Sequence, residues 1–152
     1  SGGAGEVGYL PVPGAPLTTV ISYPRASAFQ SLAGGDAVRA LVAKYGLDDT
    51  DTAAAVAAVG ADHPLLDELG DRLAVGVAAI CAVLDPSLVV LTGDIGRAGG
   101  PALAERIERA VTRIVPVHPA VRVTEVAGNA VLAGAVQAAT RVARDTVFDT
   151  LA

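Results

Sequence analysis

The sequence predicts an α/β fold, and the order of elements over residues 64–150 is the main reason. Helical and strand-like segments alternate there, one strand-like segment is apolar throughout, and a glycine-rich segment follows it. A short, wholly apolar run between helices is typical of a buried parallel strand. Because α/β folds bind ligands in the loops after such strands, the glycine-rich segment is a candidate ligand loop.

The helix that opens this region is the best defined of these elements. Pro64 suits the first turn of a helix, and Pro86 ends the helical pattern, so we expect a helix over 64–84. Its second half is apolar nearly all round, which indicates burial on most faces. The other elements expected here are the strand 88–92, the loop 93–100, a helix over 101–115, the strand 121–124 and a last helix over 130–150.

The first third of the chain is predicted to contain two strands and two short helices. Residues 7–12 and 17–23 alternate in the manner of strands around a turn at Pro13-Gly14. A helix over 36–45 ends at a glycine, and an alanine-rich helix over 52–59 has Asp49 or Asp51 as its N-cap.

Composition indicates one soluble domain. The 152 residues are 52% hydrophobic with only five aromatics, so the core is built from small side chains. The net charge is −5 and the cations are scattered, which argues against nucleic-acid binding by this chain itself. The apolar run 73–84, flanked by Arg72 and Asp85, is too short to cross a membrane, and no signal peptide opens the chain. We expect a cytoplasmic protein in which Cys81 is a buried thiol.

The opening stretch Ser1-Gly-Gly-Ala-Gly-Glu-Val-Gly-Tyr9 resembles the Gly-x-Ala-Gly-Glu-[Ile/Val]-Gly-His signature of the ROK family of repressors and sugar kinases. Three later segments are similar to further family motifs and follow in the family's order: 29–37, 84–94 and 128–135. The resemblance implies that residues 1–152 form the C-terminal lobe of a ROK protein. Its fold would then be the actin-like, hexokinase-like (ribonuclease H-like) ATPase fold. Because the chain opens inside a motif and contains no Met, we expect an N-terminal lobe to precede it in a longer protein.

Many ROK proteins bind zinc through one His and three Cys, and the resemblance implies that this chain does not. The corresponding positions are Tyr9, Ile21, Tyr23 and Ala28. None of these side chains offers the thiolate, imidazole or carboxylate that zinc requires. We therefore expect no zinc and no other metal, with apolar packing in place of the metal.

The resemblance assigns sugar binding to Glu6, Tyr9 and Gln30. Glu6 retains the family's carboxylate, which can accept hydrogen bonds from two sugar hydroxyls. Tyr9 replaces the family's His, and Gln30 replaces a Glu as a neutral group. A structural role stays open for two of them: Glu6 could bond a nearby backbone turn, and Gln30 could serve packing alone.

For nucleotide binding the resemblance points to Gly93, Asp94 and Gly96, after the buried strand. The family's Gly-Gly pair is Thr92-Gly93 here, so a plain turn is the alternative to an ATP site. His63 and His118 both precede Pro without a second metal ligand nearby in sequence, and we expect neither to be functional.

Three functions follow from the resemblance. The first is the sugar-sensing and dimerisation lobe of a ROK transcriptional regulator, with DNA contacted only by a helix-turn-helix domain outside this chain. The second is the C-terminal lobe of an ATP-dependent sugar kinase, the one case in which ATP and magnesium are expected. The third is a scaffold that no longer binds sugar. Because the zinc, sugar and nucleotide positions have all changed, the regulator is preferred, with a sugar or sugar phosphate as effector, a homodimer as assembly and no membrane partner.

Overall fold

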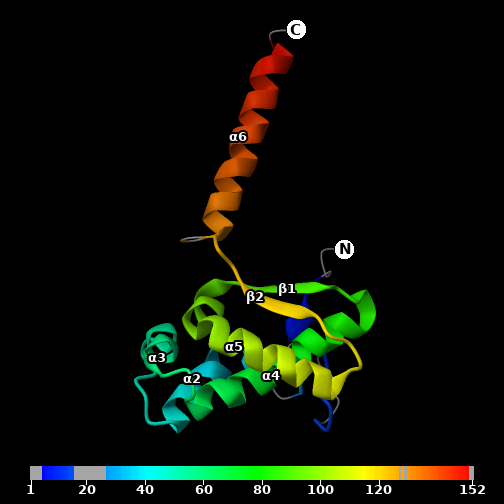
Figure 1. Cartoon of the computed structure of the whole chain (residues 1–152). Helices are drawn as coiled ribbons and strands as arrows, with labels where there is room; N and C mark the ends of the chain where they lie inside the picture. Colours follow the sequence, from blue (N-terminus) through cyan, green and yellow to red (C-terminus); the bar gives the residue numbers. More distant parts are fainter. Residues whose placement is uncertain (1–4, 16–26, 127, 129, 151–152) are drawn as a thin grey trace.

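A computed structural model describes residues 5–15, 27–126, 128 and 130–150 of the chain. It shows a helical body with a two-stranded parallel sheet on one side and a last helix that projects away from the body (Figure 1). The elements in order are η1 (Val7–Tyr9, a 3₁₀ turn), α1 (Gln30–Ala33), α2 (Gly35–Lys44), α3 (Thr52–Ala58), α4 (Pro64–Leu84), β1 (Leu88–Leu91), α5 (Gly93–Ile114), β2 (Ala120–Val123) and α6 (Ala130–Thr150).

The expected actin-like, hexokinase-like lobe is wrong for this structure. That fold needs a sheet of several strands, whereas the described residues form a mostly helical body in which only β1 and β2 pair. One cause lies near the N-terminus. The predicted strand 7–12 is instead the 3₁₀ turn η1 followed by a single antiparallel bridge between Pro11 and Ala28. The other predicted strand, 17–23, lies outside the described residues.

Helix α4 spans Pro64–Leu84, as the sequence predicts, and both of its ends have a local cause. The Nδ1 atom of His63 accepts a hydrogen bond from the backbone N–H of Leu65 at 3.2 Å, which caps the first turn. At the other end Asp85 adopts a left-handed conformation with φ of 44° just before Pro86. In the same way Asp51, one of the two expected caps, accepts from the N–H of Ala54 at the start of α3.

Helix α5 begins at Gly93, so the prediction of a loop over 93–100 is wrong. Residues 93–99 are helical, and the chain breaks its direction at Gly100, where φ is +57° and ψ is −157°. Pro101 then restarts the helix, because proline lacks only an N–H that a first turn does not use. The glycines therefore shape a kinked helix rather than an open loop.

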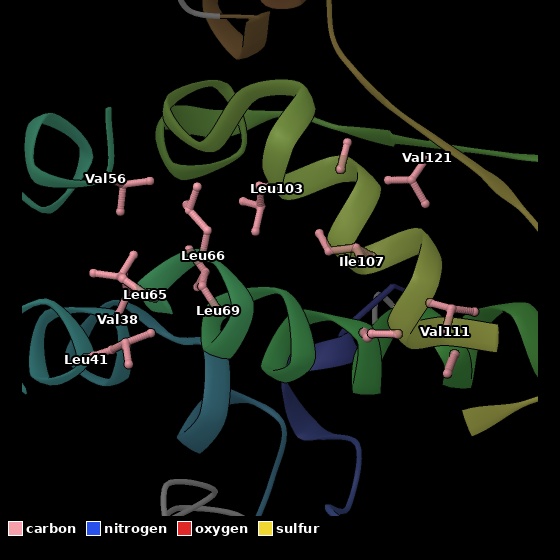
Figure 2. Packing of buried hydrophobic residues seen from close by; sticks show 14 of the residues in the cluster. Val38, Leu41, Val56, Leu65, Leu66, Leu69, Leu103, Ile107, Val111 and Val121 are labelled. Carbon is pink, nitrogen blue, oxygen red and sulfur yellow. The ribbon is translucent and has the colours of Figure 1, made fainter. Parts of the chain in front are cut away.

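The core is formed by α4 and α5 packed against one another, with α2 and α3 closing one end (Figure 2). Leu65 and Leu69 of α4 and Leu103 and Ile107 of α5 are all fully buried. The two helices approach closely at Gly70: a methyl group there would lie 2.8 Å from Cβ of Arg106. The small-residue content predicted such tight packing.

The two strands are parallel, as predicted, with Leu88 opposite Ala120 and Leu91 opposite Val123. Successive side chains of a strand point to opposite faces. Val121 on the inner face is buried against the helices, whereas Leu88 is 51% and Val90 50% exposed on the outer face. The prediction of a fully buried strand is therefore wrong for one face of β1, because nothing described covers it.

Helix α6 has the predicted limits, Ala130–Thr150, but an unexpected setting. Every side chain from Val131 to Val147 is exposed. Among the described helices, none combines the length and the apolar character needed to cross a bilayer.

Candidate functional site

The segment that carries Glu6 and Tyr9 is fastened beside α1 by backbone hydrogen bonds. The N–H of Val12 donates to the carbonyl of Ser27 at 2.9 Å, and that of Phe29 donates to Leu10 at 2.7 Å. Phe29 in turn lies on α4, because a methyl group at Gly76 would fall 2.5 Å from its ring. The aromatic ring thus fixes both short segments to the body.

Glu6 lies at a hollow of about 360 Å³ formed with the end of α4, whose residues here are Ala79, Ile80, Val83 and Leu84. The rest of the lining comes from Gly5, Val7 and Leu10, so a single carboxylate stands beside an apolar surface. The side chain of Glu6 is exposed and makes no capping bond to the η1 turn that follows it. The alternative that Glu6 bonds this turn is therefore not what the structure shows.

Gln30 lines a second hollow, of about 270 Å³, together with Ser31, Gly34, Gly35, Asp36 and Ala37. Gln30 begins α1, and the hollow lies at the start of α2, where the first N–H groups of the helix have no partner within it. Gly34 is required there, because a methyl group would fall 2.5 Å from the carbonyl oxygen of Gln30. A methyl group at Gly8 would lie 3.6 Å from Gln30 Oε1, so the η1 turn touches the Gln30 side chain.

The three predicted sugar residues do not share one hollow, because Glu6 and Gln30 line different hollows and Tyr9 lines neither of these two. Tyr9 is 49% exposed and ends η1, whose Val7 lines the Glu6 hollow and whose Gly8 lies against Gln30. The turn separates the apolar hollow of Glu6 from the polar hollow of Gln30.

The residues predicted to bind a nucleotide lie in the first turns of α5. Gly93 has φ of +76°, and a methyl group at Gly96 would lie 3.3 Å from Cβ of Leu91. Asp94 accepts a 2.7 Å hydrogen bond from Arg97, which also donates to the carbonyl of Gly128 at 2.9 Å. These contacts place Gly93, Asp94 and Gly96 in the first turns of α5. They also lie after β1, whereas the Glu6 hollow lies at the end of α4 that precedes β1.

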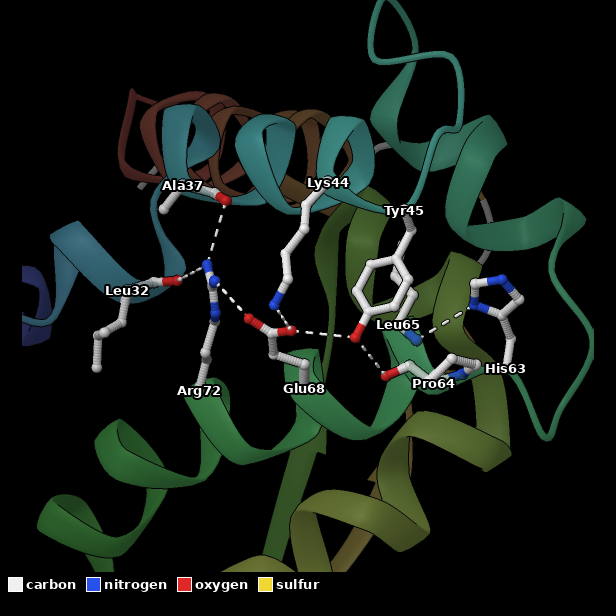
Figure 3. A network of polar contacts seen from close by, with 9 residues as sticks. All are labelled: Leu32, Ala37, Lys44, Tyr45, His63, Pro64, Leu65, Glu68 and Arg72. Atoms are coloured by element: carbon white, nitrogen blue, oxygen red, sulfur yellow. Dashed lines mark hydrogen bonds and ion pairs between the residues drawn. The ribbon is translucent and has the colours of Figure 1, made fainter.

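A network of hydrogen bonds and ion pairs around Glu68, between α2 and α4, was not predicted from the sequence (Figure 3). The Glu68 carboxylate accepts from Lys44 Nζ at 2.6 Å, from Arg72 at 2.7 Å and from the Tyr45 hydroxyl at 3.1 Å. These contacts lower the pKa of Glu68 to about 2, the Lys44 hydrogen bond most of all. Of these contacts, only the Glu68–Arg72 ion pair could have been predicted from the sequence, because the two residues are four apart on one helix.

Arg72 connects this network to the Gln30 hollow. Its guanidinium donates to the carbonyl of Leu32 at 3.4 Å and to that of Ala37 at 3.3 Å. These two carbonyls precede and follow Gly34-Gly35 in the chain, and of the two residues Ala37 lines the hollow. Arg72, itself held by Glu68, therefore anchors the backbone between α1 and α2 beside the hollow.

The Glu68 network predicts a free energy of unfolding that falls in acid. A carboxyl whose pKa is lower in the folded than in the unfolded state stabilises the fold above the unfolded value, and that stabilisation is lost as the pH falls through the folded value. Since the folded pKa is about 2 against an ordinary 4.5, the loss falls between these two pH values. We expect it to amount to roughly 1–2 kcal/mol, because a quarter of the side chain faces solvent.

Urea unfolding of wild type and Glu68→Gln at neutral pH and at a series of acid pH values measures this. The variant is expected to be less stable at neutral pH and to lose less stability on acidification. Glu105→Gln, which removes an exposed carboxylate of α5, is the matched control and keeps the wild-type response. An identical acid response in Glu68→Gln and wild type would contradict the assignment.

The remaining residues considered for chemistry are the cysteine, the two histidines and the positions that correspond to zinc ligands in ROK proteins. Cys81 is buried and free, as predicted, and burial raises the pKa of its thiol. His63 caps α4 and packs edge-on against Tyr45, while His118 is exposed. Of the four zinc-equivalent positions, Tyr9 and Ala28 are described, and Ile21 and Tyr23 lie outside the described residues. Within the described ranges no group of three or more His, Cys, Asp or Glu side chains is placed to hold a metal ion.

A larger and more acidic groove of about 590 Å³ runs between α5 and β2. Its carboxylates are Glu105, Glu108 and Glu125. Glu108 accepts from the N–H of Val121 at 2.8 Å and pairs with Arg122 at 3.3 Å. That carboxylate joins β2 to α5, so its role is structural.

Comparison of the chain with protein-family models, with curated proteins and with solved structures gives no significant match. The function must therefore be argued from the arrangement of the side chains. The surface around η1 is the part of the described structure where the predicted sugar residues gather.

Proposed function

We propose that this chain is the sugar-sensing and dimerisation lobe of a cytoplasmic transcriptional regulator, as its resemblance to ROK proteins implies. One observation supports this most: the η1 turn stands between two hollows, with Glu6 at one and Gln30 at the other. DNA would be contacted by a domain outside this chain. The effector would be a sugar or sugar phosphate.

The chemistry of the η1 surface suits a polyol. A carboxylate accepts hydroxyl protons, an amide both donates and accepts, and a phenol does the same. The half-exposed ring of Tyr9 adds an apolar face of the kind that packs on sugar carbons. Because Arg72 and Phe29 hold the surrounding backbone, these groups need little rearrangement on binding.

The contacts of Gly93, Asp94 and Gly96 favour binding over phosphoryl transfer. A kinase must present both of its substrates at once in a fixed geometry. Here the carboxylate of Asp94 is engaged by Arg97, and Gly96 packs on Leu91. The sugar-kinase alternative therefore has less support than the regulator.

The direct test is calorimetric titration of the protein with a panel of hexoses and pentoses. Wild type is expected to bind one of them, and Glu6→Gln to bind it about tenfold or more weakly, since each charge-assisted bond is worth roughly 1.5–3 kcal/mol. The substitution keeps the shape of the side chain and removes its charge. Glu6 is exposed, so the thermal unfolding midpoint should stay unchanged.

Glu105→Gln is the matched control, because it makes the same chemical change at an exposed position of α5. It should bind the sugar as wild type does. Equal affinity of wild type and Glu6→Gln would remove Glu6 from the site, and a wild-type protein that binds no sugar of the panel would refute the proposal.

A further inference from the structure

Strand β2 has one edge at which no other described strand pairs. Within the residues that the structure describes, β2 pairs with β1 alone, and the N–H of Thr124 just after β2 donates to the carbonyl of Leu91 at 2.8 Å. Along a strand, the backbone N–H and C=O groups of successive residues point to opposite edges. The backbone groups of Val121 and Val123 therefore point away from β1, to the other edge of β2.

The protein's own side chains cover this edge at Val121 but not at Val123. The N–H of Val121 donates to Glu108 at 2.8 Å, and the carbonyl of Val121 accepts from Arg122 at 2.7 Å. At Val123 the described part of the chain provides no hydrogen bond to the outward N–H or carbonyl. Because Val123 is partly buried, these two groups are the ones to which a further strand would bond.

A groove lies along the same edge of β2. It is the groove of about 590 Å³ whose walls are α5 on one side and Val121, Arg122 and Val123 on the other. Pro101 and Ala104 of α5 give it an apolar lining. Its volume falls within the range of about 300–1,000 Å³ that is usual for binding clefts. A free backbone edge thus lies beside a space that a bound segment can fill.

The charge of this groove is not balanced. Glu108 is paired with Arg122 at 3.3 Å, whereas Glu105 and Glu125 are exposed and take part in no ion pair among the described residues. A second copy of β2 at this edge would bring the same two carboxylates with it, and like charges placed together are unfavourable. The charge therefore favours a cationic occupant over a second copy of the chain.

We propose that the free edge of β2 binds an extended, basic segment of a partner protein, which adds a strand to the sheet and bonds to the backbone of Val123. Lysine or arginine side chains of that segment pair with Glu105 and Glu125, and its apolar side chains rest on the α5 wall. In strand addition, main-chain hydrogen bonds give affinity and the side-chain contacts give specificity. The residues that line this groove line neither the Glu6 nor the Gln30 hollow, so the inference does not depend on sugar binding.

Fluorescence anisotropy with a labelled, end-blocked peptide of alternating lysine and valine tests the proposal on the whole chain. Wild type is expected to bind it with a Kd on the order of 100 μM or lower, and to bind a glutamate–valine peptide of the same length at least about tenfold more weakly. A lysine–valine peptide methylated at every backbone nitrogen keeps its charges and loses its N–H donors, so it should also bind about tenfold or more weakly. Equal binding of the methylated peptide, or no saturable binding of the unmethylated one, would overturn the proposal.

Charge variants show whether the peptide binds at this groove. The double variant Glu105→Lys with Glu125→Lys should weaken binding of the lysine–valine peptide by about tenfold or more. The matched control is Asp62→Lys with Asp145→Lys, which makes the same change in net charge at exposed positions outside the groove. It should bind within about threefold of wild type, because distant surface charges are screened. Equal losses in the two double variants would show that only the net charge matters and would overturn the proposal.

Val123→Pro tests the backbone contact from the side of the protein. Its N–H points away from β1, and proline is tolerated on an edge strand in that position, so the pairing of β1 and β2 should survive. The variant should keep the wild-type circular dichroism spectrum and bind the lysine–valine peptide several-fold more weakly. Wild-type affinity in the folded variant would overturn the proposal, as would a wild-type dimer that Glu105→Lys with Glu125→Lys dissociates or strengthens. If Val123→Pro does not fold, the methylated peptide decides, because it tests the same main-chain hydrogen bonds.

Discussion

Leu103→Ala is expected to lower the free energy of unfolding by about 3–5 kcal/mol, the typical cost of emptying a fully buried leucine site. Leu103 has no exposed surface and lies among the buried side chains of α3, α4 and α5 (Figure 2). The loss combines the transfer of apolar atoms with the cavity that closely packed helices cannot close. Urea unfolding followed by circular dichroism at 222 nm, the usual helix signal, measures it.

Ile114→Ala is the matched control, since it shortens an aliphatic side chain of the same helix that is 50% exposed. It should cost less than about 1 kcal/mol, because no buried cavity forms. Similar losses for the two variants would mean that α5 does not pack on α4 as described.

Gly70→Val is expected to destabilise the protein by about 3 kcal/mol, at the upper end of the range for overpacking. Even a methyl group would lie 2.8 Å from Cβ of Arg106 and 3.6 Å from the backbone nitrogen of Ile107. Arg106 cannot easily move aside, because Asp67 binds its Nε at 2.6 Å and the carbonyl of Ala102 binds its NH1 at 3.0 Å. The added side chain must therefore push α4 and α5 apart, and thermal unfolding would show a lower midpoint.

The same change at Gly134 separates packing from helix propensity. Gly134 lies within α6 and has open space where a side chain would go. Gly134→Val should be neutral or slightly stabilising, because valine favours a helix more than glycine does. If Gly70→Val were equally harmless, the close approach of the two long helices would be wrong.

The approximate limits predicted for α4 and α6 agree with the structure because the signals for these helices are local. Pro64 and Pro86 mark the ends of α4, and the apolar side of α6 repeats at the helical period. The parallel pairing of β1 and β2 also followed from their order along the chain. The prediction over 93–100 failed because its glycines suggested a loop, whereas residues 93–99 form the first turns of α5 and Gly96 lies close to Leu91.

The fold class and the Glu68 network could not be predicted from the sequence, because both depend on contacts between distant parts of the chain. Residues 7–12 have a strand-like pattern, but a strand forms only where a partner strand extends the ladder. Within the part of the chain that the structure describes, Pro11 pairs only once, with Ala28. Lys44 and Glu68 are 24 residues apart, and no periodicity relates them. At the candidate site the sequence singled out Glu6, Tyr9 and Gln30. It did not predict that Glu6 and Gln30 would line two different hollows.

The parallel pairing of β1 has a consequence for biosynthesis. Leu88 pairs with Ala120, so the whole of α5 must be translated before β1 can find its partner. At the usual elongation rates of about 5–20 residues per second, β1 waits roughly two to six seconds on the ribosome with its backbone unpaired. During that interval Leu88–Leu91 is a short apolar segment with a free edge, the kind of nascent sequence that chaperones protect. Codons that slow translation of α5 would lengthen this exposure and lower the yield of folded protein.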